Sequence, residues 1–187
     1  MSNNPYAPPS APVADVEDNR LPDNSNPLFA VGTVKVCVMW LVTFGIYQLY
    51  WFYRHWSLIR GRDRSDIMPA MRAIFSIFFV YSLFKRMDED GKTYSVPESL
   101  AVVPLTVAFI LLQISSRLPD PWWLLYFLNV AVIGVAQQYA NKVNLSAAPE
   151  HERNESFSGW NWVGIVLGGL FLCLMLIGLF FVPEDIE

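Results

Sequence analysis

The sequence predicts an all-α, polytopic integral membrane protein with about four spanning helices, one interfacial or partly inserted helix and a disordered N-terminal tail. Of its 187 residues, 53% are hydrophobic and only 16% are charged, whereas a soluble domain carries about 25% charged residues. The charged residues cluster between long apolar runs, which is the pattern of a membrane protein. Aromatic side chains gather beside basic segments, as they do at a membrane–water interface.

The predicted tail is Met1–Pro27, and residues 28–187 form the predicted helical membrane domain. The tail has six prolines and few apolar residues, so it cannot bury enough surface to offset the entropy of ordering. It lacks the basic and apolar regions of a cleaved signal peptide. A second role is open for its first residues, because Asn4–Pro9 could serve as a polyproline II ligand.

The first predicted span is Val34–Tyr53. It is just long enough to cross a hydrocarbon core of about 30 Å as a helix. Eight of the seventeen residues in Trp40–Trp56 are aromatic, and basic residues follow them, as expected at a membrane surface. The alternative is a re-entrant hairpin that turns back at Gly45. Its bend would need other helices or water to satisfy the backbone polar groups.

The string T-F-G-I-Y-x-x-Y-W-F-Y-R at Thr43–Arg54 follows an apolar lead-in that contains a lysine. It resembles the first segment of a family of small prokaryotic membrane proteins that is known only as a domain of unknown function. The resembling part runs roughly from Gly32 to Arg86. The resemblance implies a bacterial cytoplasmic (inner) membrane protein, and it brings no activity, cofactor or catalytic residue to this chain.

Three further spans are predicted, at Ser99–Ser116, Trp122–Tyr139 and Trp160–Val182. The segment Ile67–Arg86 is expected to lie in the interface or to insert part-way, because its uncharged run Ala73–Phe84 is too short to span. Its alternative is an extra span in which Arg72 reaches back to the membrane surface. The connections Met87–Glu98 and Ala140–Gly159 are predicted to be polar loops.

Polar and small residues within these spans are candidates for helix packing. Gln113 and Asn129 flank the short connection Arg117–Pro121, so we expect them at similar depth. A hydrogen bond between them would contribute about 0.6–2 kcal/mol, and the alternative is a pair that contacts a substrate. Gly164 and Gly168 form a G-x-x-x-G motif, which suits either packing within the chain or a dimer seam.

The connection after the first span is rich in arginine. Its candidate lipid-binding residues are Arg54, Arg60, Arg62 and Arg64. They lie at a membrane edge and are interleaved with Asp63 and Asp66, so anionic lipid headgroups are favoured over nucleic acid as their partner.

No motif of catalysis, phosphate binding or metal binding is found in the sequence, so no catalytic, cofactor or metal residue is predicted. Cys37 and Cys173 are isolated within predicted spans and are expected to be packing residues. We expect a non-enzymatic scaffold, accessory subunit or membrane organiser, which would act as a homo-oligomer or in a larger membrane complex. The alternatives are a small oligomeric channel or transporter, for which Asn129–Gln137 offers a polar stripe, and an enzyme acting on lipids.

Charge asymmetry predicts the orientation. With four spans, the loops Arg54–Glu98 and Ala140–Gly159 share one side and carry ten basic residues, against three on the other side. The positive-inside rule then places both loops in the cytoplasm and both tails outside. The hairpin alternative keeps the N-terminal tail in the cytoplasm instead.

Overall fold

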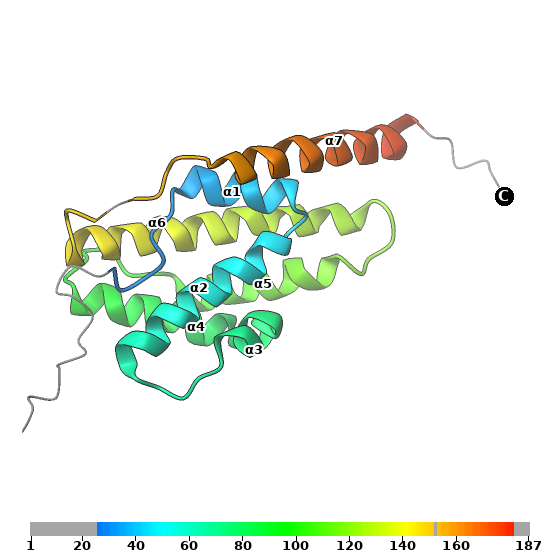
Figure 1. The fold of residues 1–187 in the computed structure, drawn as a ribbon. Helices are drawn as coiled ribbons and strands as arrows, with labels where there is room; N and C mark the ends of the chain where they lie inside the picture. Colours follow the sequence, from blue (N-terminus) through cyan, green and yellow to red (C-terminus); the bar gives the residue numbers. More distant parts are fainter. Residues whose placement is uncertain (1–25, 152, 182–187) are drawn as a thin grey trace, which may run out of the picture.

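The computed structural model describes residues 26–151 and 153–181, and all regular structure in that part of the chain is helical (Figure 1). The elements are α1 (Thr33–Val42), α2 (Ile46–Asp63), α3 (Pro69–Ile74), α4 (Ser76–Thr93), α5 (Val102–Ser115), the 3-10 helix η1 (Trp122–Leu128), α6 (Asn129–Ala147) and α7 (Gly159–Phe181). The all-α prediction is confirmed. The predictions for residues 1–25 lie outside the described residues.

Helix α6 lies at the centre of the bundle, because it packs against α1, α4 and α5. The side chains that fill the core are large and mostly aromatic. The largest fully buried ones include Trp40, Trp51, Phe52, Phe84, Met87, Phe109 and Ile133. They come from α1, α2, α4, α5 and α6, so these five helices share one core. Helix α7 stands outside it and packs along α1 (Figure 1).

The prediction of one continuous helix over Val34–Tyr53 is wrong. Helix α1 ends at Val42 and α2 begins at Ile46. Between them Phe44 has a φ of 53° and Gly45 a φ of 83°, a left-handed conformation that glycine adopts without steric cost. The chain therefore reverses, and α2 runs back from the end of α1 (Figure 1). The bend lies at Gly45, where the alternative hairpin turns back.

The backbone at this bend has hydrogen-bond partners. The Gly45 N–H donates to the Trp40 carbonyl at 2.9 Å. The hydroxyl of Tyr126 donates to the Phe44 carbonyl at 3.3 Å, and Trp40 Nε1 donates to Gln48 Oε1 across the hairpin at 3.2 Å. The N–H of Gly45 and the carbonyl of Phe44 are thus paired, as backbone groups of a bend in apolar surroundings must be.

The segment Ile67–Arg86 contains α3 and the first part of α4, because the helix is interrupted at Phe75. Helix α4 then continues to Thr93, so the prediction of a loop from Met87 to Glu98 is wrong for its first half. Two contacts hold the extra turns against the bundle. Met87 is fully buried, and Gly91 lies so close to the Tyr139 hydroxyl that a side chain there would collide with it.

Two helical stretches, Trp122–Ala147 and Gly159–Gly178, are long and apolar enough to cross a membrane. Helices α1 and α5 are apolar but shorter, so the structure does not confirm four spans. Helix α6 also extends beyond the predicted end at Tyr139, and the predicted polar loop that follows is helical as far as Ala147.

The G-x-x-x-G motif of α7 faces α1 of the same chain. A Cβ atom at Gly168 would lie 2.0 Å from the Val42 carbonyl oxygen, and one at Gly164 would lie 3.7 Å from Met39 Cε. The rings of Phe44 and Phe171 also meet edge to face, with centroids 5.1 Å apart. The structure thus places both glycines in an internal helix contact, and α1 ends beside the middle of α7.

Substituting Gly168 by alanine is expected to destabilise the fold by about 1–3 kcal/mol, because the methyl group would overlap the Val42 carbonyl. Gly169→Ala is the matched control, since a Cβ atom there meets nothing within 4 Å. Thermal unfolding of the detergent-solubilised protein measures both. Equal midpoints for the two variants would contradict the close contact between α1 and α7.

Candidate functional site

A short segment without helix or strand, residues 27–32, lies against the bundle ahead of α1, and we call it the N-terminal strap. Pro27, Leu28, Phe29 and Val31 are buried. Such a segment has no helix or sheet of its own to pair its backbone groups, and unpaired buried groups are costly. Side chains of other elements must therefore supply the hydrogen bonds.

Three amide side chains of α6 supply most of these bonds. Asn144 pairs with both backbone groups of Leu28, accepting from its N–H and donating to its carbonyl, each at 3.0 Å. Gln137 Nε2 donates to the Phe29 carbonyl at 3.0 Å. Asn141 Nδ2 donates to the carbonyl of the strap's Val31, also at 3.0 Å. Spacings of four and three residues place the three amides on one face of α6, which we call the amide ladder.

Helix α2 joins the same network. Trp51 Nε1 donates to Gln137 Oε1 at 2.6 Å, and the Phe29 N–H donates to His55 Nδ1 at 3.4 Å. The strap thus connects α2 with α6. Of the predicted polar stripe Asn129–Gln137, Gln137 faces the strap, and Asn141 and Asn144 beyond it hold the strap in the same way.

The arginines of the predicted lipid-binding loop have different surroundings. Arg62 forms an ion pair with Asp90 at 2.9 Å and donates to the Pro27 carbonyl at 3.3 Å. It therefore holds α4 and the start of the strap. The guanidinium of Arg54 lies over the ring of Phe29, 5.4 Å from its centroid. These two arginines are part of the folded framework.

The pair formed by Arg62 and Asp90 is largely shielded from solvent. The side chain of Asp90 is 10% exposed and that of Arg62 is 21% exposed. Burial raises the pKa of the Asp90 carboxyl above its ordinary value, and the nearby Arg62 guanidinium acts in the opposite direction. Without Arg62, the carboxylate would stay buried with less compensation.

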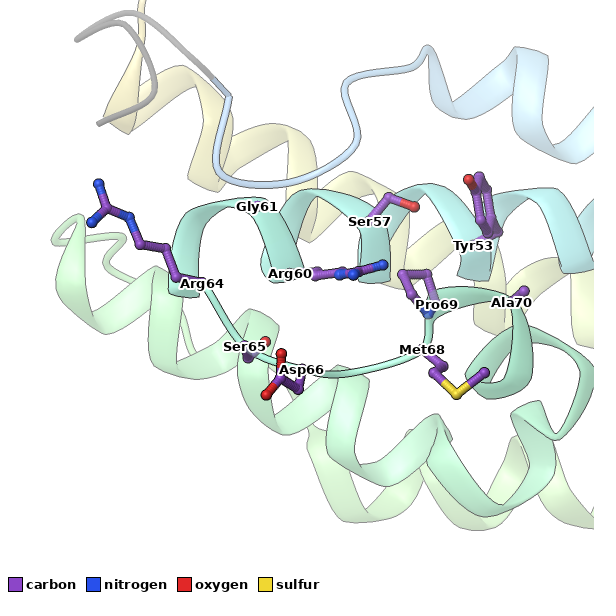
Figure 2. Close-up of a pocket in the computed structure, with 10 residues that line it drawn as sticks. All are labelled: Tyr53, Ser57, Arg60, Gly61, Arg64, Ser65, Asp66, Met68, Pro69 and Ala70. Carbon is purple, nitrogen blue, oxygen red and sulfur yellow. The ribbon is translucent and has the colours of Figure 1, made fainter. Parts of the chain in front are cut away.

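Arg60 and Arg64 line a cavity of about 760 Å³ between the end of α2 and the start of α3. Ser57, Ser65 and Asp66 add polar atoms to its wall. Figure 2 shows Arg60 lying along α2 with its guanidinium toward Pro69 at the start of α3, whereas Arg64 extends away from the cavity. Among the described residues, neither arginine has an ion-pair partner within 4.0 Å.

The predicted packing residues of α5 and α6 are also brought together. Asn129 is fully buried, and its Nδ2 lies 3.5 Å from Gln113 Oε1 and 3.5 Å from the Phe109 carbonyl. The arrangement therefore joins α5 to α6 within the core.

The sequence analysis does not predict the amide ladder, because it places Asn141 and Asn144 in the polar loop Ala140–Gly159. Its signal is present in the chain: amides recur at 137, 141 and 144, in a helical spacing that continues an apolar run. The segment that the ladder binds is also visible in the sequence, because residues 27–31 (Pro-Leu-Phe-Ala-Val) form an apolar stretch just before the first helix.

The chain matches no model of a protein family, no curated protein and no solved structure. Function is therefore inferred from geometry and composition.

Replacing Asn144 with leucine is expected to destabilise the protein by about 3 kcal/mol, because both backbone groups of Leu28 would be buried without partners. Gln138→Leu is the control, since Gln138 is exposed on the same helix. The measurements are the unfolding midpoint and the rate of proteolysis near residue 27. If the two variants have equal midpoints and equal cleavage rates, the strap is not held by the amide ladder.

Arg62→Met is expected to destabilise the fold at neutral pH by about 1–3 kcal/mol, because Asp90 stays charged without its partner. The folded-state pKa of Asp90 then rises further above its unfolded value, so the variant should regain stability relative to wild type as the pH falls through that pKa. Unfolding midpoints between pH 7 and pH 4 measure this, with Arg117→Met as control. A pH-independent difference between Arg62→Met and wild type would rule out the charge as its cause.

Proposed function

We propose that the chain is a non-enzymatic integral membrane protein that acts as a scaffold or accessory subunit in the bacterial cytoplasmic membrane. One observation carries the proposal: α7 presents an apolar surface that the other described residues leave uncovered, and the bend between α1 and α2 lies beside the middle of α7. A surface of this kind suits lipid or the helices of a membrane partner.

Helix α7 has the dimensions of a membrane span. Its 23 residues extend about 35 Å at 1.5 Å per residue, enough for a hydrocarbon core of about 30 Å. None of the residues in its most apolar window is buried. Its large exposed side chains are Trp160, Trp162, Val163, Val166, Leu167, Leu170, Phe171, Leu174, Leu176 and Ile177. So much exposed apolar surface on one helix would be unfavourable in water.

The contact between α1 and α7 supports a re-entrant hairpin. Gly168, which meets Val42, lies nine residues after Gly159, or about 14 Å along α7. If α7 spans the membrane, the bend at Gly45 therefore lies near the bilayer centre. Helices α1 and α2 then enter and leave from one side. The hairpin of α5 with η1 and α6 enters from that same side, and its short turn carries Arg117 and Asp120.

The described ion pairs support this sidedness. These contacts lie at one end of the bundle, which we call the charged end. It consists of the C-terminal ends of α2, α4 and α6 and the connection from α6 to α7. Arg62 pairs with Asp90 and Lys142 with Glu98. Lys35 donates to the Ser156 carbonyl at 2.7 Å. The positive-inside rule favours placing this end in the cytoplasm.

A scaffold with this arrangement would bind its partner through α7. The α1 side of α7 is occupied by its own chain, so a homo-oligomer or a larger membrane complex would use the opposite face. Co-purification from native membranes in mild detergent tests this role. A stable partner that is lost when Leu167 and Leu174 are both replaced by alanine, but kept when Ile46 is, supports it. Purification as a lone monomer would count against it.

The re-entrant arrangement predicts where the chain ends lie. A reporter fused at Asp23 should be cytoplasmic and one fused at Asp185 should be external, because the α1–α2 hairpin and the α5–α6 hairpin each return to the side from which they enter, whereas α7 crosses the membrane once. Paired alkaline phosphatase and green fluorescent protein fusions measure this. Finding both positions outside would restore four spans, and finding both inside would mean that α7 does not cross.

A further inference from the structure

We propose that the cavity between α2 and α3 binds the headgroup of an anionic glycerophospholipid, with Arg60 holding the phosphate. This inference deepens the proposed function and rests on its membrane placement for the source of the ligand. It separates Arg60 from Arg54 and Arg62, which the folded framework already uses.

The walls of the cavity offer unused donors for an anion. Arg60 is exposed and lies within the cavity, between α2 and Pro69 (Figure 2). Ser57, one helical turn earlier, lines the same cavity. Its hydroxyl oxygen is buried and has no hydrogen-bond partner among the described residues. The phosphate is therefore held by Arg60, and the Ser57 hydroxyl donates to it only when the Ser57 side chain rotates toward the cavity.

The other charged groups favour a headgroup that has hydrogen-bond donors as well as a phosphate. Asp66 adds one carboxylate to the wall, and the Arg64 guanidinium extends away from the cavity (Figure 2). Arg60 is therefore the cation that complements one phosphodiester. Asp66 can accept a hydrogen bond from a headgroup hydroxyl. Phosphatidylglycerol meets both requirements.

Apolar surface leads from the cavity toward the membrane. Tyr53 and Met68 line the cavity, and 64% of the Met68 side chain is exposed. On α3 the exposed residues Met71 and Ile74 continue this surface. A lipid whose phosphate lies at Arg60 would therefore find a path for its acyl chains along α3, which a free phosphate would not need.

The depth of Arg60 fits a headgroup. Arg60 lies fourteen residues after Ile46, or about 21 Å along α2 from the bend. With the bend at the bilayer centre, about 15 Å of that length crosses half of the hydrocarbon core and the rest reaches the headgroup region. The helix thus carries the guanidinium to the level where lipid phosphates lie.

The test uses the purified full-length protein in neutral detergent, with native mass spectrometry as the readout. Dioleoyl phosphatidylglycerol or dioleoyl phosphatidylcholine is added at equal concentration. Wild type should retain phosphatidylglycerol, and Arg60→Gln should lower its occupancy about tenfold, as expected for loss of a charge-assisted hydrogen bond. Arg117→Gln, an exposed arginine away from the cavity, should bind as wild type does.

Ser57→Ala and Arg60→Lys provide second variants if Arg60→Gln does not fold. Ser57→Ala should weaken phosphatidylglycerol binding several-fold, and Arg60→Lys should retain part of it. Equal retention of the two lipids by wild type, or equal loss in Arg60→Gln and Arg117→Gln, overturns the proposal. Displacement of the lipid by millimolar inorganic phosphate assigns the cavity to a free anion and also overturns it. These outcomes do not depend on the fusion results, so failure of the lipid site can be told apart from failure of the membrane arrangement.

Discussion

The paired hydrogen bonds between Asn144 and Leu28 fix the point from which the chain enters the bundle. Asn144 offers an acceptor and a donor to one buried peptide unit, and Gln137 and Asn141 repeat the donor along α6. Because the strap is held to the end of α6 in this way, α1 must start at the charged end and run inward. The direction of α1 then determines where the hairpin turns.

The same requirement, that buried backbone groups be paired, explains the bend. Helix α1 is only ten residues long, so it ends inside the bundle and the chain must reverse there. Gly45 allows the left-handed turn, and the Tyr126 hydroxyl pairs the Phe44 carbonyl. Helix α2 can then carry its arginines back to the charged end, where Arg62 meets Asp90. The bend at Gly45 thus brings the end of α2, with its arginines, back to the end of the bundle where the strap lies.

Composition and run length were sufficient to predict an all-α fold and the long apolar helix α7. They were insufficient at Gly45, because an apolar run of twenty residues has the same composition whether it crosses or turns back. The choice depends on Tyr126 and Gln48, which reach the bend only in the folded chain. The arginines show the same limit. Spacing grouped Arg54, Arg60, Arg62 and Arg64, whereas packing gives Arg62 a carboxylate partner and leaves Arg60 facing a cavity.

The central claim is that the hairpin turns near the middle of the bilayer, and the depth of Ile46 tests it most directly. Ile46 is 70% exposed beside the bend. A nitroxide on Ile46→Cys, in a Cys37→Ala, Cys173→Ala background, can be compared by electron paramagnetic resonance with one on Arg64→Cys in reconstituted membranes. The account predicts high collision rates with oxygen and low rates with a water-soluble nickel complex at position 46, and the reverse at 64. Access of the nickel complex to position 46 equal to that at 64 would contradict it.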